Sequence, residues 1–101
     1  MILEIALIDI LPGTHAEFEA VVATAVETVL RPAAGFVSFE LRHGVEHSDS
    51  YVLLIGWATL EDHTVGFRES ERFVKWRELI GPFFAGAPRV DHWSKVFEVA
   101  R

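Results

Sequence analysis

A histidine and a phenylalanine four residues apart, His63 and Phe67, are the first candidates for chemistry in this 101-residue sequence. Residues at this spacing share one face of a helix, so both side chains can point into the same site. Because an imidazole titrates near neutral pH, His63 could remove the acidic proton of a phenol or dihydroquinone. The alternative is a surface imidazole that donates to a nearby carbonyl. We predict that His63 is a catalytic base.

A second histidine, His92, lies in a predicted strand near the end of the chain. It shares one face of that strand with Val90 and Ser94. A histidine on a mostly apolar strand face either lines a pocket or is a core residue with its hydrogen bonds satisfied. We keep His92 as a second candidate base.

Arg68 adjoins this helical segment and could neutralise an enolate or a carboxylate. Its alternative role is a surface ion pair with one of three nearby carboxylates, Glu69, Glu71 and Glu78.

Two further carboxylates, Glu4 and Glu40, interrupt strands that are otherwise apolar. A buried carboxylate needs a partner, for which Arg42 is one candidate. Both residues could instead lie at strand edges.

Aromatic residues gather in the second half of the chain and include Trp57, Phe73, Trp76 and Phe83. Aromatic side chains at helical spacing mostly build the core. Some can also form flat walls against which an aromatic substrate stacks, and Trp76 is the best candidate for such a wall. We predict substrate contacts from five residues: Phe67, Trp76, Trp57, Phe73 and Phe83.

Composition and charge exclude several classes of protein. The chain has no cysteine, which excludes disulfides and thiol chemistry. His43 and His47 straddle the end of a predicted strand and so do not share a helix face as the histidines of a zinc protease do, and we expect no metal. The net charge of −6 and the missing aromatic RNA-binding pattern argue against nucleic acid. The apolar run at residues 1–3 is broken by Glu4, which argues against a signal peptide or a membrane span. We expect a cytoplasmic protein.

The elements that would position these residues begin with an apolar run at residues 2–11, which predicts a strand buried on both faces. Thr14, with Glu17 three positions later, has the pattern of a capping box. Apolar residues then repeat at helical spacing up to Leu30, and Pro32 ends the helix.

Two strands are predicted next, at residues 36–44 and 51–58, joined by a polar hairpin loop. The second of them is apolar on both faces. The first alternates, and its apolar face contains Val37, Phe39, Leu41 and His43.

Thr59 with Asp62 repeats the capping pattern and predicts a short helix over residues 61–67. Ser70 is expected to cap another helix, which Gly81 and Pro82 end. A last strand is predicted over residues 89–99.

The resulting order, βαββαβ, predicts an α+β, ferredoxin-like fold: a four-stranded antiparallel sheet with helices on one face. We treat residues 1–101 as a single domain. Two of the strands are apolar on both faces, although helices can cover only one face of such a sheet. A second copy of the chain is the simplest cover for the other face.

With this order established, residues 57–92 resemble the antibiotic biosynthesis monooxygenase (ABM) family. The resemblance is carried by Trp57 to His63, Gly66 to Ser70, Phe73, Trp76, Phe83-Phe84 and Pro88 to His92. It implies a homodimeric α/β barrel with a pocket in each subunit. For the monooxygenases of the family it also implies oxidation by O2 without metal or flavin.

At several positions this sequence differs from the residues that two branches of the family use for catalysis. The haem-degrading branch uses an Asn, a Trp and a His where this sequence has Ala6 or Leu7, Phe67 and Arg77, so we expect no haem degradation. The polyketide oxidases use an Asn and a Trp at the spacing that His63 and Phe67 occupy here.

Two functions stay open. The first is cofactor-independent oxygenation of a quinol-like or polyketide-like aromatic, with His63 or His92 as base and Arg68 or Trp76 as the orienting group. The second is a module that binds a small ligand, or acts in a stress response, without turnover.

Overall fold

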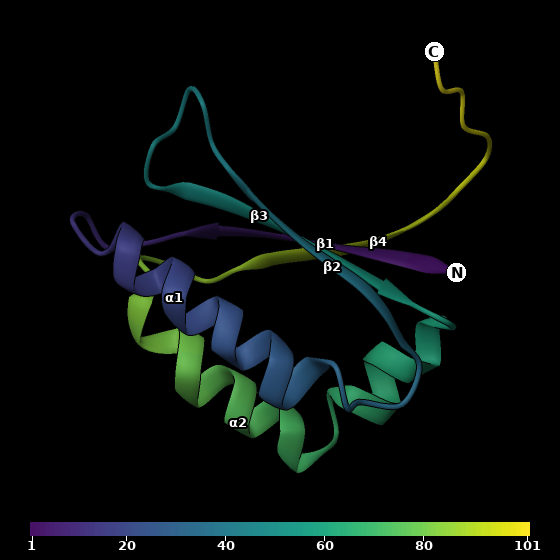
Figure 1. Ribbon diagram of the computed structural model, residues 1–101. Coiled ribbons are helices and arrows are strands. Elements are labelled where there is room, and N and C mark those ends of the chain that lie inside the picture. The colour runs from purple at the N-terminus through teal and green to yellow at the C-terminus, as the bar shows by residue number, and fades with distance from the viewer.

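The computed structural model describes residues 1–101 and contains a four-stranded antiparallel sheet in the order β2-β3-β1-β4 (Figure 1). The α+β, ferredoxin-like fold is therefore confirmed. The strands are β1 (Ile2–Asp9), β2 (Phe36–His43), β3 (Ser50–Trp57) and β4 (Arg89–Ser94). The helical segments are α1 (His15–Ala25), η1 (Val26–Leu30), η2 (Asp62–Phe67), α2 (Glu71–Ile80) and η3 (Gly81–Phe83).

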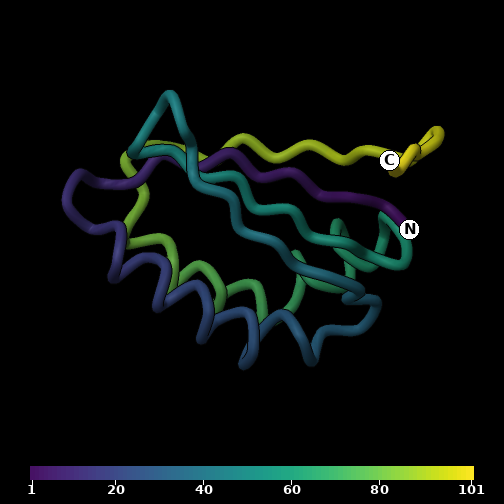
Figure 2. Tube along the Cα trace, turned by 45° about the horizontal axis from the view of Figure 1, so that its top comes forward, coloured from purple at the N-terminus to yellow at the C-terminus, as the bar shows by residue number.

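Both long helices lie side by side under one face of the sheet (Figures 1 and 2). The core fills the space between the two layers because α1 and β1 each present an apolar face to it. On β1 and β3 one face is buried, with Ala6 and Ile8 beside Leu53 and Ile55. The other face is apolar, as predicted, but only partly buried in the single chain. None of the helices combines the length and the apolar character that a membrane span requires.

The predicted apolar face of β2 is wrong at its first member. Phe36 pairs with Trp57 while Ser38 pairs with Gly56, so Val37 is an extra residue in a β-bulge. The bulge turns Phe36 toward the core and leaves Val37 51% exposed.

Only one of the two predicted capping boxes forms. Thr59 and Asp62 exchange backbone-to-side-chain hydrogen bonds of 3.1 Å each, as predicted. Thr14 precedes α1, but its hydroxyl donates to the carbonyl of Leu11 at 2.6 Å and does not cap the helix. The short bond to the preceding turn satisfies the hydroxyl locally, so the pairing with Glu17 is absent.

Two helical segments, η1 and η2, are π-helical. In η2 the amide of Arg68 donates to the carbonyl of His63, five residues earlier, at 2.9 Å. Such segments are rare and occur mostly as single turns, often at functional sites. In this wider turn His63 and Phe67 are both buried and face the core.

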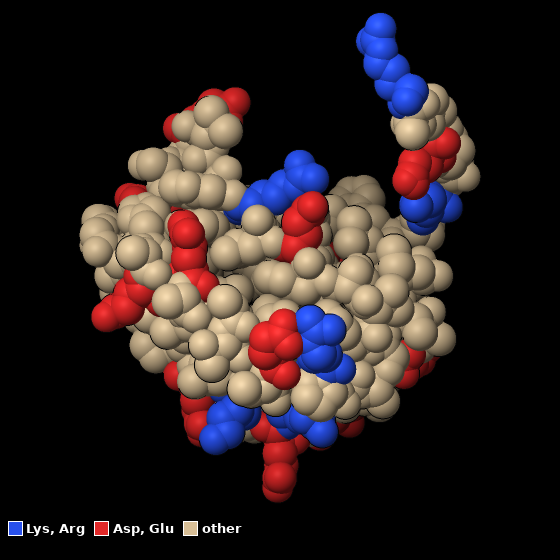
Figure 3. All heavy atoms as spheres, viewed as in Figure 1, with Lys and Arg blue, Asp and Glu red and all other residues tan.

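The last strand is shorter than predicted, because β4 ends at Ser94 and residues 95–101 have no regular secondary structure. Beyond Ser94 there is no neighbouring strand segment, since Ser94 pairs with Ile2 at the start of β1. Figure 3 shows the tail standing clear of the body. Its apolar residues Val96 and Phe97 are 89% and 80% exposed.

The face of the sheet that turns away from the helices is apolar along its centre. We call it the open sheet face; its apolar residues are Leu3, Ile5, Leu7, Val52, Leu54 and Trp93. Leu7 is 40% and Trp93 57% exposed in the single chain. The charged residues of this face lie at its margins: Glu40 and Arg42 on β2, Arg89 and Asp91 on β4, and Asp9 at the end of β1.

Candidate functional site

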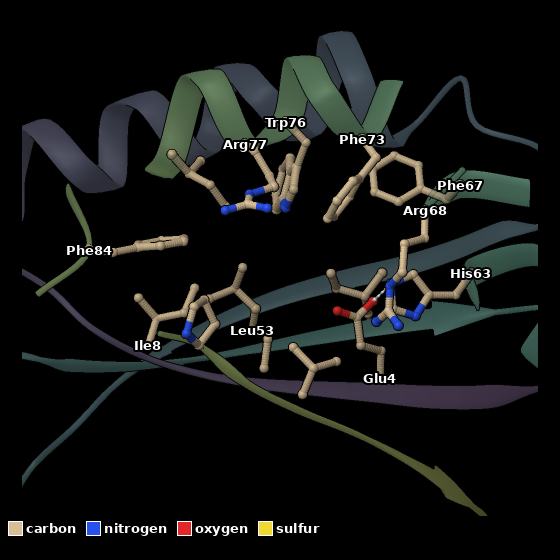
Figure 4. Close-up of a pocket in the computed structure, with 15 residues that line it drawn as sticks. Glu4, Ile8, Leu53, His63, Phe67, Arg68, Phe73, Trp76, Arg77 and Phe84 are labelled. Carbon is tan, nitrogen blue, oxygen red and sulfur yellow. Dashed lines mark ion pairs between the residues drawn. The ribbon is translucent and has the colours of Figure 1, made fainter. Parts of the chain in front are cut away.

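A cavity of about 260 Å³ lies between the sheet and the segment formed by η2 and α2 (Figure 4). Ten of its 15 lining residues are hydrophobic, so it suits a mostly apolar ligand. Four predicted site residues from this segment line it together with His63: Phe67, Arg68, Phe73 and Trp76.

One end of the cavity is polar, and its centre is the buried carboxylate of Glu4 on β1. Trp57 on β3 donates its indole N–H to Glu4 Oε1 at 2.9 Å. The same oxygen lies 3.2 Å from Nε2 of His63. Glu4 is therefore a buried carboxylate with partners, as the sequence indicated, and these partners are Trp57 and His63. The candidate partner Arg42 instead pairs with Glu40 at the surface.

His63 joins this carboxylate to the second predicted histidine. Its Nδ1 lies 2.7 Å from Nε2 of His92, which β4 places directly beside Glu4. The imidazole of His63 also stacks on the indole of Trp57, with ring centres 5.2 Å apart and an interplanar angle of 13°. We call Glu4, His63 and His92 the acid–imidazole cluster. The structure brings both candidate bases together, although His92 does not itself line the cavity.

Burial dominates the electrostatics of this cluster. It raises the pKa of Glu4, against the hydrogen bond from Trp57 and the charge of Arg68, which lower it. Burial, the Arg68 charge and His92 together lower the pKa of His63 to about 4. Burial and Arg68 also lower the pKa of His92. Each group is therefore biased toward its neutral form.

The lowered pKa of His63 predicts an acid-side loss of stability. The unfolded imidazole titrates near 6.5, so between pH 6.5 and 4 the unfolded state binds the extra proton and stability falls as pH falls. Between pH 7.5 and 5.0 this should remove about 2 kcal/mol from the free energy of unfolding. His63→Gln should abolish that part of the pH dependence in urea unfolding at fixed protein concentration.

A matched control for that experiment is His47→Gln, in the exposed hairpin loop. It should keep the wild-type pH dependence. Glu4 contributes to the pH dependence of stability with the opposite sign, because its raised pKa favours the folded state at low pH. Since both variants retain Glu4, its contribution does not distinguish them. An unchanged pH dependence in His63→Gln would contradict the assignment.

Arg68 belongs to the cavity rather than to the surface ion pairs. None of the chain's salt bridges includes it, so the alternative pairing with a neighbouring Glu is absent. Arg77 also lines the cavity, with its guanidinium 5.9 Å from the ring centre of Phe73. In the sequence, Arg77 was noted only as a departure from the haem-degrading pattern. Its position four residues after Phe73 could have predicted that both side chains face the same cavity.

Two predicted wall residues do not line the cavity. Trp57 is fully buried behind the acid–imidazole cluster, where its indole N–H donates to Glu4. Phe83 packs edge-on against Phe18 of α1 at 5.6 Å, because η3 turns it toward the core. Its neighbour Phe84 lines the cavity instead.

The chain holds no group of three or more His, Asp or Glu side chains arranged to bind a metal ion. His43, one of the two histidines considered for such a site, lies 2.6 Å from the carbonyl of Ser48, as does His15 at 2.7 Å. These imidazoles hold the hairpin loop.

Comparison with known proteins identifies the relatives of this chain. The sequence profile of the antibiotic biosynthesis monooxygenase family matches residues 1–79. The uncharacterized protein YczJ of Bacillus subtilis (strain 168) is 34% identical over 96 residues, which cover 95% of this chain and all of YczJ.

Solved structures agree in fold. A candidate antibiotic biosynthesis monooxygenase from Bordetella bronchiseptica is 42% identical, with a TM-score of 0.89 over 95% of this chain and 97% of that one. SnoaB, a cofactor-independent oxygenase from Streptomyces nogalater, superposes with a TM-score of 0.81 at 16% identity, over 99% of this chain and 97% of its own.

Proposed function

The chain belongs to the antibiotic biosynthesis monooxygenase family, and from that membership we propose that it is a cofactor-independent monooxygenase that oxidises a quinol-like or polyketide-like aromatic molecule with O2. The observation that carries the proposal is the cavity itself. It combines apolar and aromatic walls with the acid–imidazole cluster and Arg68 at one end.

Oxidation of an aromatic by O2 without a cofactor requires few groups from the protein. A deprotonated, electron-rich aromatic can itself give an electron to O2, so the protein must supply an apolar cavity, a base and a cation for the anion. When a ring C–H of a dihydroquinone becomes C–OH and the ring becomes a quinone, the substrate supplies all four electrons that O2 takes up, and the second oxygen atom leaves as water. Here the acid–imidazole cluster would take the proton, Arg68 would stabilise the anion, and Phe67, Phe73 and Trp76 would hold the ring.

Oxygen uptake with a panel of hydroquinones tests this function. We expect uptake that persists in the presence of a chelator, and we expect His63→Ala to lower it by about 100-fold or more, the usual contribution of acid–base catalysis. His92→Ala should lower it less, since His92 does not line the cavity. His47→Ala in the exposed loop is the control and should retain full uptake.

The second candidate function is a non-catalytic module that binds a small ligand in the same cavity. It is favoured by His63 and Phe67 standing where the resembled oxidases have an Asn and a Trp. Tight binding of an aromatic ligand without oxygen uptake, by the wild-type protein, would support this function over the first.

We also propose that the protein is a homodimer that pairs through the open sheet face. The face is apolar in its centre and has its charged residues at its margins, the usual arrangement of a protein interface. Contiguous apolar surface of this kind is uncommon on monomers. The tail that follows β4 also exposes apolar residues, which would gain a partner if it packed in the same assembly.

A further inference from the structure

The two oxygen atoms of Glu4 have different surroundings. Oε1 accepts the indole N–H of Trp57 and faces Nε2 of His63, whereas no side-chain or backbone group donates to Oε2. No fully buried side-chain oxygen or nitrogen of the chain lacks a hydrogen-bond partner, so Oε2 is not sealed in the core. Because Glu4 lines the cavity, Oε2 opens onto it, and Figure 4 shows one carboxylate oxygen pointing into the cavity, away from His63.

Neither imidazole of the acid–imidazole cluster offers a free nitrogen to a ligand in the cavity. Nε2 of His63 is engaged by Glu4, and its Nδ1 by His92. His92 lies on the far side of His63, outside the cavity. The other polar groups at this end, Arg68 and the indole of Trp57, are donors only.

We propose that Glu4, through Oε2, is the catalytic base, and that His63 and His92 are positioning residues that hold its carboxylate. This inference rests on the proposed oxygenase function and names the atom that takes the proton. The substrate proton passes to Oε2 while its electron pair stays on the aromatic, and the resulting anion reduces O2 and bonds to it through a ring carbon. Glu4 returns the proton to the outer oxygen of this peroxide, which regenerates the carboxylate. The O–O bond then breaks as water leaves with the hydrogen of that ring carbon, and the carbon becomes C=O.

This role fixes the tautomers of both imidazoles. An ionised Glu4 needs a proton on Nε2 of His63, which then donates to Oε1. Nδ1 of His63 is left as an acceptor and must receive the N–H on Nε2 of His92. The opposite tautomer of His63, protonated on Nδ1, would require a protonated Glu4, which cannot act as a base.

Burial supports the role, because a carboxylate with a raised pKa is a stronger base. The titratable and charged groups that face Glu4 come from η2, β4 and the residue after η2: His63, His92 and Arg68. Arg77 of α2 is the remaining charge in the cavity wall. Loss of activity on the acid side should follow Glu4, whose protonation removes the acceptor.

The test combines kinetics with NMR. Glu4→Gln should lower kcat for hydroquinone-dependent oxygen uptake by at least about 100-fold with little change in KM. Glu17→Gln, an exposed carboxylate on α1, is the matched control and should keep the wild-type rate. His92→Ala should lower kcat, and His92→Gln should restore much of it, because an amide can still donate to His63. Uptake by Glu4→Gln within about three-fold of wild type would overturn the proposal.

Nitrogen-15 NMR of the wild-type imidazoles tests the geometry without any substrate. Nε2–H tautomers for both His63 and His92 at pH 7 support the proposal, and an Nδ1–H tautomer for His63 overturns it. If no hydroquinone is oxidised by the wild type, the proposed function fails, and the tautomers alone then decide whether Glu4 is held as an ionised acceptor.

Discussion

Ile5→Lys is expected to leave the protein monomeric at micromolar concentration. Ile5 lies on the central strand β1, in the middle of the open sheet face, and points away from the core. Its neighbours across the sheet are Leu54 and Asp91, so the new ammonium has a carboxylate nearby in the single chain. In a dimer, however, it would be buried against a second apolar face, which costs several kcal/mol.

The expected size of this effect follows from the interface. An obligate interface of about 2,000 Å² is ordinary, and at about 25 cal/mol per Å² of apolar area its burial is worth tens of kcal/mol before the costs of association. A buried ammonium should raise the dissociation constant at least about 1,000-fold. The lone subunit should also unfold at a lower urea concentration, because it loses the stabilisation that association provides.

Light scattering measures the outcome directly. The wild type should have twice the chain mass of 11.4 kDa and an unfolding midpoint that rises with protein concentration. Val74→Lys, at an exposed position on α2, is the control and should remain dimeric. A folded wild-type species of 11.4 kDa that persists at micromolar concentration would rule out the proposed dimer.

Trp57→Ala should be the most destabilising substitution in the core. The side chain is fully buried, packs against Phe36 and Phe67, and carries the N–H that satisfies Glu4. Deleting a buried aromatic costs about 3–5 kcal/mol, and leaving a buried carboxylate without its donor adds to that. Since most domains have about 5–15 kcal/mol of stability in all, a large fraction would be lost.

Two milder variants separate packing from hydrogen bonding. Trp57→Phe keeps an aromatic ring but removes the donor, so we expect a loss of about 1–3 kcal/mol and a further rise in the pKa of Glu4. Trp76→Phe shrinks another buried indole, which has no hydrogen bond to lose, and should cost less. Urea unfolding at one protein concentration ranks the three; equal losses for both Phe variants would contradict the role of the indole N–H.

Local patterns were enough to predict most of the architecture. The order of strands and helices and the Thr59–Asp62 capping box depend on residues close in sequence, and both are observed. The bulge at Val37 was missed because it depends on how β2 registers against β3. The early end of β4 likewise depends on where the neighbouring strand β1 begins.

Several members of the candidate site were predicted from the sequence, but the contacts between them were not. His63 and Arg68 were expected at a pocket, and both line the cavity. The partners of Glu4 could not be read from the sequence, since Trp57 lies 53 residues away along the chain. A buried carboxylate predicts that some partner exists. Which one it is depends on the packing of η2 against β1 and β3.

The π-helical turn of η2 makes the orientation of His63 sensitive to chain length. An α-helix advances about 100° per residue, so removing one residue between His63 and Arg68 would restore α-helical hydrogen bonding and rotate everything before the deletion by about that angle. The neighbour of His63, not the imidazole itself, would then face Glu4. Evolution could therefore have created or erased this site with a single codon insertion or deletion. Alignments of relatives that differ by one residue here will pair the wrong side chains unless the gap is placed inside the turn.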